Sequence, residues 1–225
     1  MKHQAVIFDL FETLITEWGH RKYVKSEMCQ DLGVERELFD CHWESLDKAR
    51  YLGKVSFVEA LQYVGAQCGV TPDEALLQRM LALHVETKSA CFEHVDPEVY
   101  ELLKTLKAAG LKLAIVSNCS PEEVIPMAES RLAACFDEII LSCEVGLKKP
   151  DLGIYEEAAR RLGVAAGDCA FVGDGGSHEL EGARNAGMTA IQAKWYTNQH
   201  PSKRESMPGF LIAERPLEVL REVGV

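Results

Sequence analysis

The chain has 225 residues, 47% of them apolar, and a formal net charge of −11. This apolar content suffices for a sizeable core and argues against intrinsic disorder. The negative charge argues against general binding to nucleic acid or to an anionic membrane surface, although a local site can still bind a small anion.

The lack of a recognisable targeting signal and the scattered cysteines predict a cytoplasmic protein. We find no signal-peptide pattern at the N-terminus, and no apolar run approaches the ~20 residues that span a bilayer. The eight cysteines are scattered and form no C-x-x-C pair. We interpret them as reduced thiols, because a chain of this length needs no disulfides to fold.

Short apolar runs alternate with helical patterns along the chain. The runs cover residues 5–8, 111–116, 138–141, 169–172 and 189–193, and the helical patterns cover 96–110, 120–133, 151–163 and 178–187. Continuous apolar runs are typical of strands covered on both faces. The order predicts an α/β fold, with a Rossmann-like parallel sheet and right-handed crossovers.

Several residues mark the predicted helix ends. Asp96 and Pro97 have the N-cap and first-position chemistry of a helix that stops at Gly110. Ser120 and Glu123 have capping-box spacing. The next two helical patterns end at glycines 163 and 187.

Residues 16–91 carry no convincing strand. They predict helices over 20–31, 36–51, 55–68 and 72–90, the last with Thr71 and Glu74 as a capping box. About seventy residues is too long for a simple crossover. We therefore expect an all-helical cap over 16–91 inserted into a core made of 1–15 and 92–225. Near the C-terminus, 196–209 predicts a surface loop, followed by the apolar stretch 210–213 and a last helix.

Polar residues follow four of the predicted strands. In a parallel sheet these positions meet at one edge, where ligands bind. Each residue alone is more often a helix cap or a solvated loop residue, but their convergence predicts a site. They are Asp9, Ser117, Asn118, Lys148 or Lys149, Asp174 and Glu179.

Four segments in this order resemble the motifs of the haloacid dehalogenase (HAD) superfamily of hydrolases. They are "FDLFETL", "VSN", "GLKKPD" and "FVGDGGSHELEGARNAGM". The insertion is similar in position to the helical cap of type C1. The resemblance implies a HAD-like core, a hydrolytic enzyme and a substrate chosen by the cap.

The resemblance also implies roles for particular residues. Asp9 matches the nucleophile, Ser117 the hydroxyl that donates to a substrate oxygen, and Lys149 the cation that offsets negative charge. Asn118 and Phe11 are assigned to substrate binding. A Mg²⁺ ion is implied, with Asp9, Asp174, Glu179 and the backbone carbonyl of Phe11 as ligands.

Position 11 departs from the pattern of the phosphatases. They carry an acid there, which protonates the leaving oxygen and then activates water, help worth ~10²–10⁴ in rate. Phe11 can do neither, and Glu12 stands where Gly is usual. An aromatic at 11 and a tyrosine at 155 resemble the dehalogenase branch, which uses no metal, whereas Asp174 and Glu179 resemble metal ligands.

Three functions follow from these patterns. The first is a Mg²⁺-dependent phosphatase acting on a small phosphorylated metabolite, with the missing acid replaced by a cap residue, by Glu12 or by a good leaving group. The second is a 2-haloacid dehalogenase, and the third a weakened binding protein. Candidate pocket residues are Glu17, Trp18, His20, Arg21, Tyr23, Trp43, Arg50 and Tyr51. A monomer and a homodimer are equally compatible with the sequence.

Overall fold

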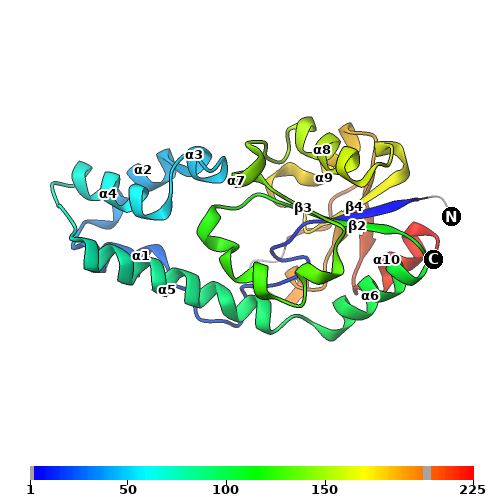
Figure 1. Cartoon of the computed structure of the whole chain (residues 1–225), viewed down its shortest axis with the longest axis horizontal. Coiled ribbons are helices and arrows are strands. Elements are labelled where there is room, and N and C mark those ends of the chain that lie inside the picture. The colour runs from blue at the N-terminus through cyan, green and yellow to red at the C-terminus, as the bar shows by residue number, and fades with distance from the viewer. Residues whose placement is uncertain (1–2, 200–203) are drawn as a thin grey trace.

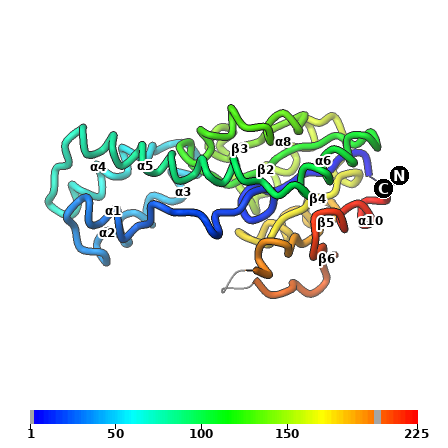
Figure 2. Tube along the Cα trace, turned by 90° about the horizontal axis from the view of Figure 1, so that it is seen from below, coloured from blue at the N-terminus to red at the C-terminus, as the bar shows by residue number. Residues whose placement is uncertain are grey.

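The computed structural model describes residues 3–199 and 204–225. The molecule is elongated, with helices α1–α5 at one end and the sheet at the other (Figure 1). The two views agree that both termini lie at the sheet end, far from α1–α5 (Figure 2). The chain passes to that end before α1 and returns along α5 (Figure 2).

The sheet has six parallel strands in the order β3-β2-β1-β4-β5-β6. They are β1 (Ala5–Phe8), β2 (Lys112–Ser117), β3 (Glu138–Leu141), β4 (Cys169–Gly173), β5 (Thr189–Ala193) and β6 (Leu211–Ala213). The five predicted strands and the α/β class are confirmed. Strand β1 lies in the middle, so its C-terminal end is flanked by the ends of β2 and β4.

Alternate residues of β1 pack into different cores. Val6 and Phe8 join the cluster beneath α6 (Pro97–Ala108) and α10 (Glu218–Val223). Ala5 and Ile7 join the cluster beneath α8 (Leu152–Leu162) and α9 (Glu179–Asn185). Because helices cover both faces, every strand position favours an apolar side chain, which explains the continuous apolar runs.

The inserted helices pack around an apolar cluster of their own, which includes Phe39, Trp43, Phe57 and Met80. The helices are α1 (Lys25–Leu32), α2 (Arg36–Ser45), α3 (Asp47–Tyr51), α4 (Phe57–Gln67) and α5 (Glu74–Glu93). Phe39 stacks on Trp43 with ring centroids 5.3 Å apart. The predicted helix over 36–51 is interrupted at Leu46, and the helix predicted from residue 20 begins only at Lys25.

Buried and partly buried ion pairs hold these helices against the core. Lys88 of α5 pairs with Glu17 and, at 3.0 Å, with Glu123. Arg50 of α3 pairs with Glu122 at 2.7 Å. Glu122 and Glu123 belong to the turn that follows β2, so the strand end that carries Ser117 is also where the inserted helices are anchored.

The segment 120–133 does not form the predicted α-helix. It forms three 3₁₀ turns, Pro121–Glu123, Ile125–Glu129 and Ala133–Cys135. The capping box of Ser120 and Glu123 is present, but it caps only the first turn. Pro126 lacks a backbone N–H and its ring clashes with the preceding turn of a helix, so a continuous α-helix is blocked.

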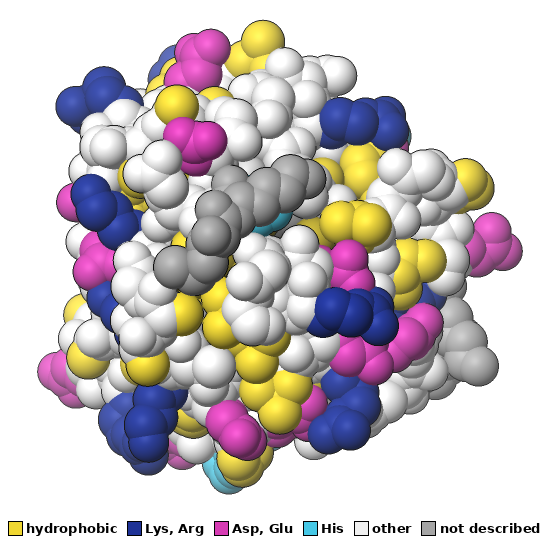
Figure 3. Space-filling view, turned by 90° about the vertical axis from the view of Figure 1, so that its right-hand side faces the viewer, with side chains coloured by type: hydrophobic (Ala, Val, Ile, Leu, Met, Phe, Trp, Pro, Cys, Tyr) yellow, Lys and Arg dark blue, Asp and Glu magenta, His cyan; other side chains and the backbone are white. Residues whose placement is uncertain are grey.

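Charges of both signs are interspersed with apolar side chains on the end of the core that faces away from α1–α5 (Figure 3). Within the described residues, no helix is long and apolar enough to cross a membrane.

The predicted capping box at the start of α5 is wrong. Asp73 is the N-cap, and its carboxylate accepts a 2.7 Å hydrogen bond from the N–H of Leu76. Thr71 is exposed and lies outside the helix. The sequence favoured Thr71 because Thr71 and Glu74 have the spacing of a capping box. In the structure the helix begins later, and the side chain of Asp73 alone accepts from the N–H of Leu76.

Replacing these two residues tests the assignment. We expect Asp73→Ala to lower the free energy of unfolding by about 1 kcal/mol, because a helix N–H loses its acceptor. Thr71→Ala should change it by less than about 0.5 kcal/mol. Urea unfolding followed by circular dichroism measures both, and a larger loss for Thr71→Ala would contradict the assignment.

Candidate active site

The predicted site residues lie together at the C-terminal edge of the sheet. The ends of β1, β2 and β4 carry Asp9, Ser117 and Asp174. The N–H of Asp9 donates to the carbonyl of Val172 at 2.8 Å, which extends the β1–β4 pairing to the acid itself. A pocket of about 160 Å³ lies here, lined by Asp9, Phe11, Glu12, Asn118, Lys149, Asp174, Gly176, Ser177, Glu179 and Arg204.

Lys149 is buried between two acids. Its ammonium donates to Asp9 and, at 2.5 Å, to Glu179. Burial opposes a charged lysine, but the two carboxylates outweigh burial and raise its pKa. Burial and the neighbouring Asp9 raise the pKa of Glu179 to about 8, and burial likewise raises that of Asp9. Lys148 is only half-buried, so Lys149 is the lysine that the fold places in the site.

Asp9, Asp174 and Glu179 form a compact cluster of buried acids. One carboxylate oxygen from each lies within 4.8 Å of the others. Three carboxylates this close repel one another strongly unless cations neutralise them. Lys149 lies against two of them, and Arg204 pairs with Asp174 at 2.6 Å. Arg204 belongs to the segment predicted only as a surface loop, and sequence reasoning missed it.

Glycines give the acids room and hydrogen bonds. A Cβ atom at Gly173 would collide with the carboxylate of Glu179. The N–H groups of Gly175 and Gly176 donate to Glu179 and Asp174 at 3.0 and 2.8 Å. Gly175 has a φ of +97°, a conformation that residues with a side chain rarely adopt.

The polar side chains of Ser117 and Asn118 differ in their hydrogen bonding. The hydroxyl of Ser117 is buried and has no hydrogen-bond partner among residues 3–199 and 204–225. The amide of Asn118 donates to the carbonyl of Lys149 at 2.9 Å and accepts from its N–H at 2.7 Å. Asn118 was assigned to substrate binding; in the structure its amide holds the backbone of Lys149.

Phe11 and Glu12 follow Asp9 in the loop after β1. The ring of Phe11 lies beneath the ammonium of Lys88, 4.8 Å from the ring centroid. Glu12 has a φ of +59°, which explains why glycine is usual there. Its carboxylate accepts from Thr16 at 2.6 Å and from the N–H of Glu17 at 2.9 Å. Burial raises its pKa.

Tyr155 and His178 do not enter the pocket. Tyr155 is fully buried, contacts Phe171 edge-on, and donates through its hydroxyl to the carbonyl of Glu179 at 2.8 Å. It thus fixes the first residue of α9. His178 is exposed in the left-handed conformation just before α9 and caps no N–H.

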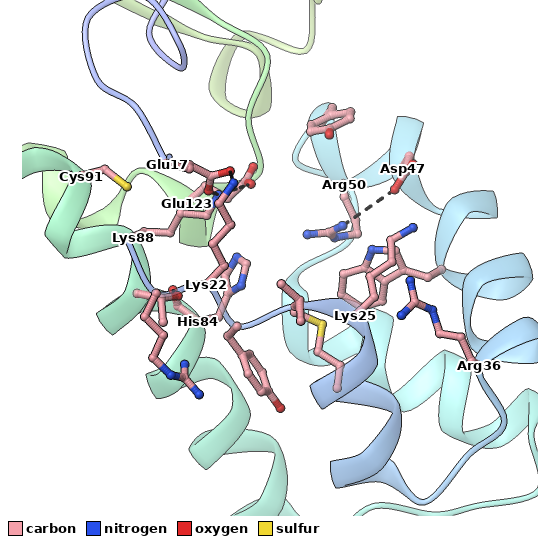
Figure 4. A pocket seen from close by; sticks show the side chains of 17 residues that line it. Glu17, Lys22, Lys25, Arg36, Asp47, Arg50, His84, Lys88, Cys91 and Glu123 are labelled. Atoms are coloured by element: carbon pink, nitrogen blue, oxygen red, sulfur yellow. Dashed lines mark hydrogen bonds and ion pairs between the residues drawn. The ribbon is translucent and has the colours of Figure 1, made fainter. Parts of the chain in front are cut away.

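A second cavity of about 530 Å³ lies among the inserted helices. Figure 4 shows Lys88 and His84 of α5 on one side and Lys25, Arg36 and Arg50 on the other. Of the candidate pocket residues, Glu17, Arg21, Tyr23, Trp43, Arg50 and Tyr51 line it. Trp18 and His20 are not among its lining residues, and the ring of His20 packs against that of His94.

His84 is a polar residue of this cavity that sequence reasoning missed. It is 8% exposed and stacks on Phe57 with centroids 4.7 Å apart. Neither ring nitrogen has a hydrogen-bond partner in the described part of the chain. Burial lowers its pKa, so the neutral ring offers one donor and one acceptor.

The two cavities meet at the loop after β1. Phe11 and Glu12 line the small pocket, and Glu17 and Lys88 line the large cavity. Glu12 accepts a hydrogen bond from Glu17, and Lys88 lies over Phe11. Residues that line one cavity therefore contact residues that line the other.

A parallel α/β sheet that gathers acids, a lysine and a serine at its C-terminal edge has its candidate site where Rossmann-like folds bind their ligands. The sequence model of the haloacid dehalogenase-like hydrolase family matches residues 3–187. The chain therefore belongs to that family and is a hydrolase. This confirms the resemblance read from the motifs.

Known relatives include phosphatases and dehalogenases. The chain is 27% identical to the glyceraldehyde 3-phosphate phosphatase of Methanopyrus kandleri, over 98% of both chains. It is 28% identical to the (S)-2-haloacid dehalogenase of Pseudomonas putida, over 98% of this chain and 93% of that protein. The crystal structure of 2-haloacid dehalogenase from Pseudomonas syringae superposes with a TM-score of 0.67 at 23% identity, covering 98% and 97% of the two chains.

Replacing each of the two neighbouring lysines tests the buried ion pairs. With chelator present, Lys149→Met should lower the free energy of unfolding by about 3–5 kcal/mol, because Asp9 and Glu179 lose their common cation. Lys148→Met should change it by less than about 0.5 kcal/mol.

The pH dependence of this loss has a defined sign. In Lys149→Met the folded pKa values of both acids lie above their unfolded values, so the folded state binds protons more tightly. The loss in free energy of unfolding caused by Lys149→Met should therefore be largest near pH 8 and shrink toward pH 5. Equal effects of the two variants, or a deficit that grows as the pH falls, would contradict the assignment.

Proposed function

We propose that this chain is a Mg²⁺-dependent phosphatase acting on a small phosphorylated metabolite through an aspartyl-phosphate on Asp9. The observation that carries the proposal is the buried cluster of Asp9, Asp174 and Glu179 beside Lys149 and the unpaired hydroxyl of Ser117. In this proposal Asp9 supplies the attacking carboxylate, and the three carboxylates supply oxygen ligands for a hard cation. Lys149 and Ser117 donate to the phosphoryl oxygens.

Asp9 would supply the nucleophile. Its carboxylate oxygen attacks phosphorus while the bond from phosphorus to the leaving oxygen breaks, and water then hydrolyses the aspartyl-phosphate to phosphate. Lys149 stabilises the negative charge shared by Asp9 and the phosphoryl group. Asn118 supports this role because its side-chain amide binds both the backbone N–H and the backbone carbonyl of Lys149.

The acid cluster fits a magnesium ion because carboxylate oxygens are the ligands that this ion prefers. Asp9, Asp174, Glu179 and, as the resemblance implies, the carbonyl of Phe11 would hold it. When bound, it would supply positive charge that offsets the phosphoryl oxygens. Arg204 on Asp174 is the contact with which the ion or the substrate would compete.

The unpaired hydroxyl of Ser117 fits a phosphoryl oxygen. A buried hydroxyl without a partner is costly. Ser117 precedes Asn118, which lines the small pocket, and we propose that a bound phosphoryl oxygen satisfies this hydroxyl. The small pocket has room for little more than a phosphoryl group. We propose that the rest of the substrate extends past Phe11 into the large cavity, where His84 offers a neutral donor and acceptor for a hydroxyl or carbonyl.

No carboxylate replaces the missing acid directly at position 11. The carboxylate of Glu12 is held by Thr16 and Glu17, and Lys88 is held by two glutamates that raise its pKa. We therefore infer that the enzyme acts best on esters whose leaving group departs without a proton.

We also propose that the protein acts in the cytoplasm, as either a monomer or a homodimer.

The central test of the proposal combines a metal and a variant. Phosphate release from p-nitrophenyl phosphate should require Mg²⁺ and stop with excess EDTA. Asp9→Asn should lower kcat by ~10³ or more, because the nucleophile is removed. Turnover that persists in Asp9→Asn, with calorimetry showing unchanged folding, would overturn the proposal.

Phe11 specifically favours a second candidate, a 2-haloacid dehalogenase, because a halide leaves without protonation. That function predicts halide release from 2-chloropropionate that EDTA does not inhibit. Tyr155 lends it no support, since its hydroxyl binds the backbone of Glu179. Chloride release with phosphate esters untouched would favour the dehalogenase.

Restoring an acid at position 11 tests the inference about leaving groups. Phe11→Asp should raise kcat for an alkyl phosphate by at least about tenfold, since general acid help is worth ~10²–10⁴. It should change kcat for p-nitrophenyl phosphate much less, because p-nitrophenolate leaves unprotonated. Phe11→Asn is the matched control, because asparagine is similar in size to aspartate but cannot ionise. Equal gains for both substrates would contradict the inference.

A further inference from the structure

Two cysteines lie side by side next to the catalytic pocket. Ser117 of β2 pairs in register with Leu141 of β3. Cys119 and Cys143 each lie two residues beyond that pair, Cys119 in the loop after β2 and Cys143 in the short helix α7 (Ser142–Val145). Their sulfur atoms are 3.9 Å apart.

The two backbones are already tied together. The hydroxyl of Ser142 accepts from the N–H of Cys119 at 3.0 Å and donates to its carbonyl at 3.2 Å. Both Ser142 and Cys119 are fully buried. A disulfide bond has sulfurs about 2 Å apart, so a rotation of the side chains with a small backbone shift suffices to join them.

The two thiols differ in reactivity. The hydrogen bond from Cys119, acting as donor, lowers the pKa of Cys143. The same hydrogen bond, followed by burial, raises the pKa of Cys119. Cys143 is half-buried, whereas Cys119 is fully buried. Cys143 is therefore the thiol that a soluble oxidant reaches first, and Cys119 is placed to react with it next.

We propose that Cys119 and Cys143 form a reversible disulfide when the protein meets a peroxide, and that this cross-link slows the hydrolase. The thiolate of Cys143 attacks one oxygen of hydrogen peroxide, the O–O bond breaks, and a sulfenic acid and hydroxide form. The sulfur of Cys119 then attacks the sulfenic sulfur, and water leaves. Overall, two thiols and one peroxide give one disulfide and two waters.

The cross-link would act on two elements at once. Cys119 follows Asn118, whose amide holds the backbone of Lys149. The carbonyl of Cys143 contacts Gly53, in the turn after α3, so closely that a Cβ atom there would collide with it. Joining the sulfurs therefore shifts the Ser117–Asn118 loop and the surface on which the inserted helices rest.

The experiment reads the bond directly and needs no substrate. The full-length protein is treated with hydrogen peroxide, blocked with N-ethylmaleimide, digested without reductant and analysed by mass spectrometry. We expect a peptide pair linked through Cys119 and Cys143 that dithiothreitol releases. Cys143→Ser and Cys119→Ser should each abolish it, and Cys41→Ser, which removes an exposed cysteine, should leave it intact.

Turnover of p-nitrophenyl phosphate before and after peroxide tests the consequence. Wild type and Cys41→Ser should lose at least about tenfold in kcat, since a displacement of 1 Å can cost ~10². Dithiothreitol should restore the activity, and Cys143→Ser, compared with its own untreated activity, should keep it. If both thiols are found separately alkylated at every peroxide concentration, the proposed disulfide does not form. If the disulfide forms quantitatively and kcat is unchanged, the proposed regulation is wrong. Because the bond is read by mass, its absence is distinguishable from failure of the phosphatase proposal.

Discussion

The ammonium of Lys149 between Asp9 and Glu179 is the interaction on which the pocket at the sheet edge depends. Without a cation, acids this close and this buried would protonate or destabilise the fold. The surrounding residues serve this contact: Asn118 fixes the backbone of the lysine, the hydroxyl of Tyr155 fixes that of Glu179, and Gly173 leaves space for the glutamate. Contacts around the pocket thus hold Lys149 and Glu179 in place.

Under the proposed function, the architecture separates the place of chemistry from the place of substrate selection. The sheet edge supplies a pocket large enough for a phosphoryl group, and the inserted helices supply a cavity several times larger. The ion pairs of Lys88 and Arg50 hold the two in contact through the turn after β2. A change in this turn reaches both the Ser117 loop and the cavity wall, which is why Cys119 sits at a sensitive position.

Much of the fold and site could be predicted because two strong constraints act on the sequence. Burial on both sheet faces makes the strands visible as apolar runs, and parallel strands bring their ends to one edge, which gathers Asp9, Lys149 and Asp174. Weaker local preferences misled: Asp73 caps α5 in place of Thr71, and Pro126 overrides an otherwise helical pattern. Arg204 and His84 were missed because only tertiary packing brings a loop arginine onto Asp174 or leaves a buried imidazole unpaired.

The most direct test of the account is a crystal structure of the protein grown with Mn²⁺ and beryllium fluoride, which mimics an aspartyl-phosphate. The account predicts an anomalous peak between the carboxylates of Asp9 and Asp174, with the fluoride mimic bonded to Asp9 and a fluorine within hydrogen-bond reach of Ser117. Full-occupancy Mn²⁺ elsewhere, or a mimic bound without contact to Asp9, would contradict it.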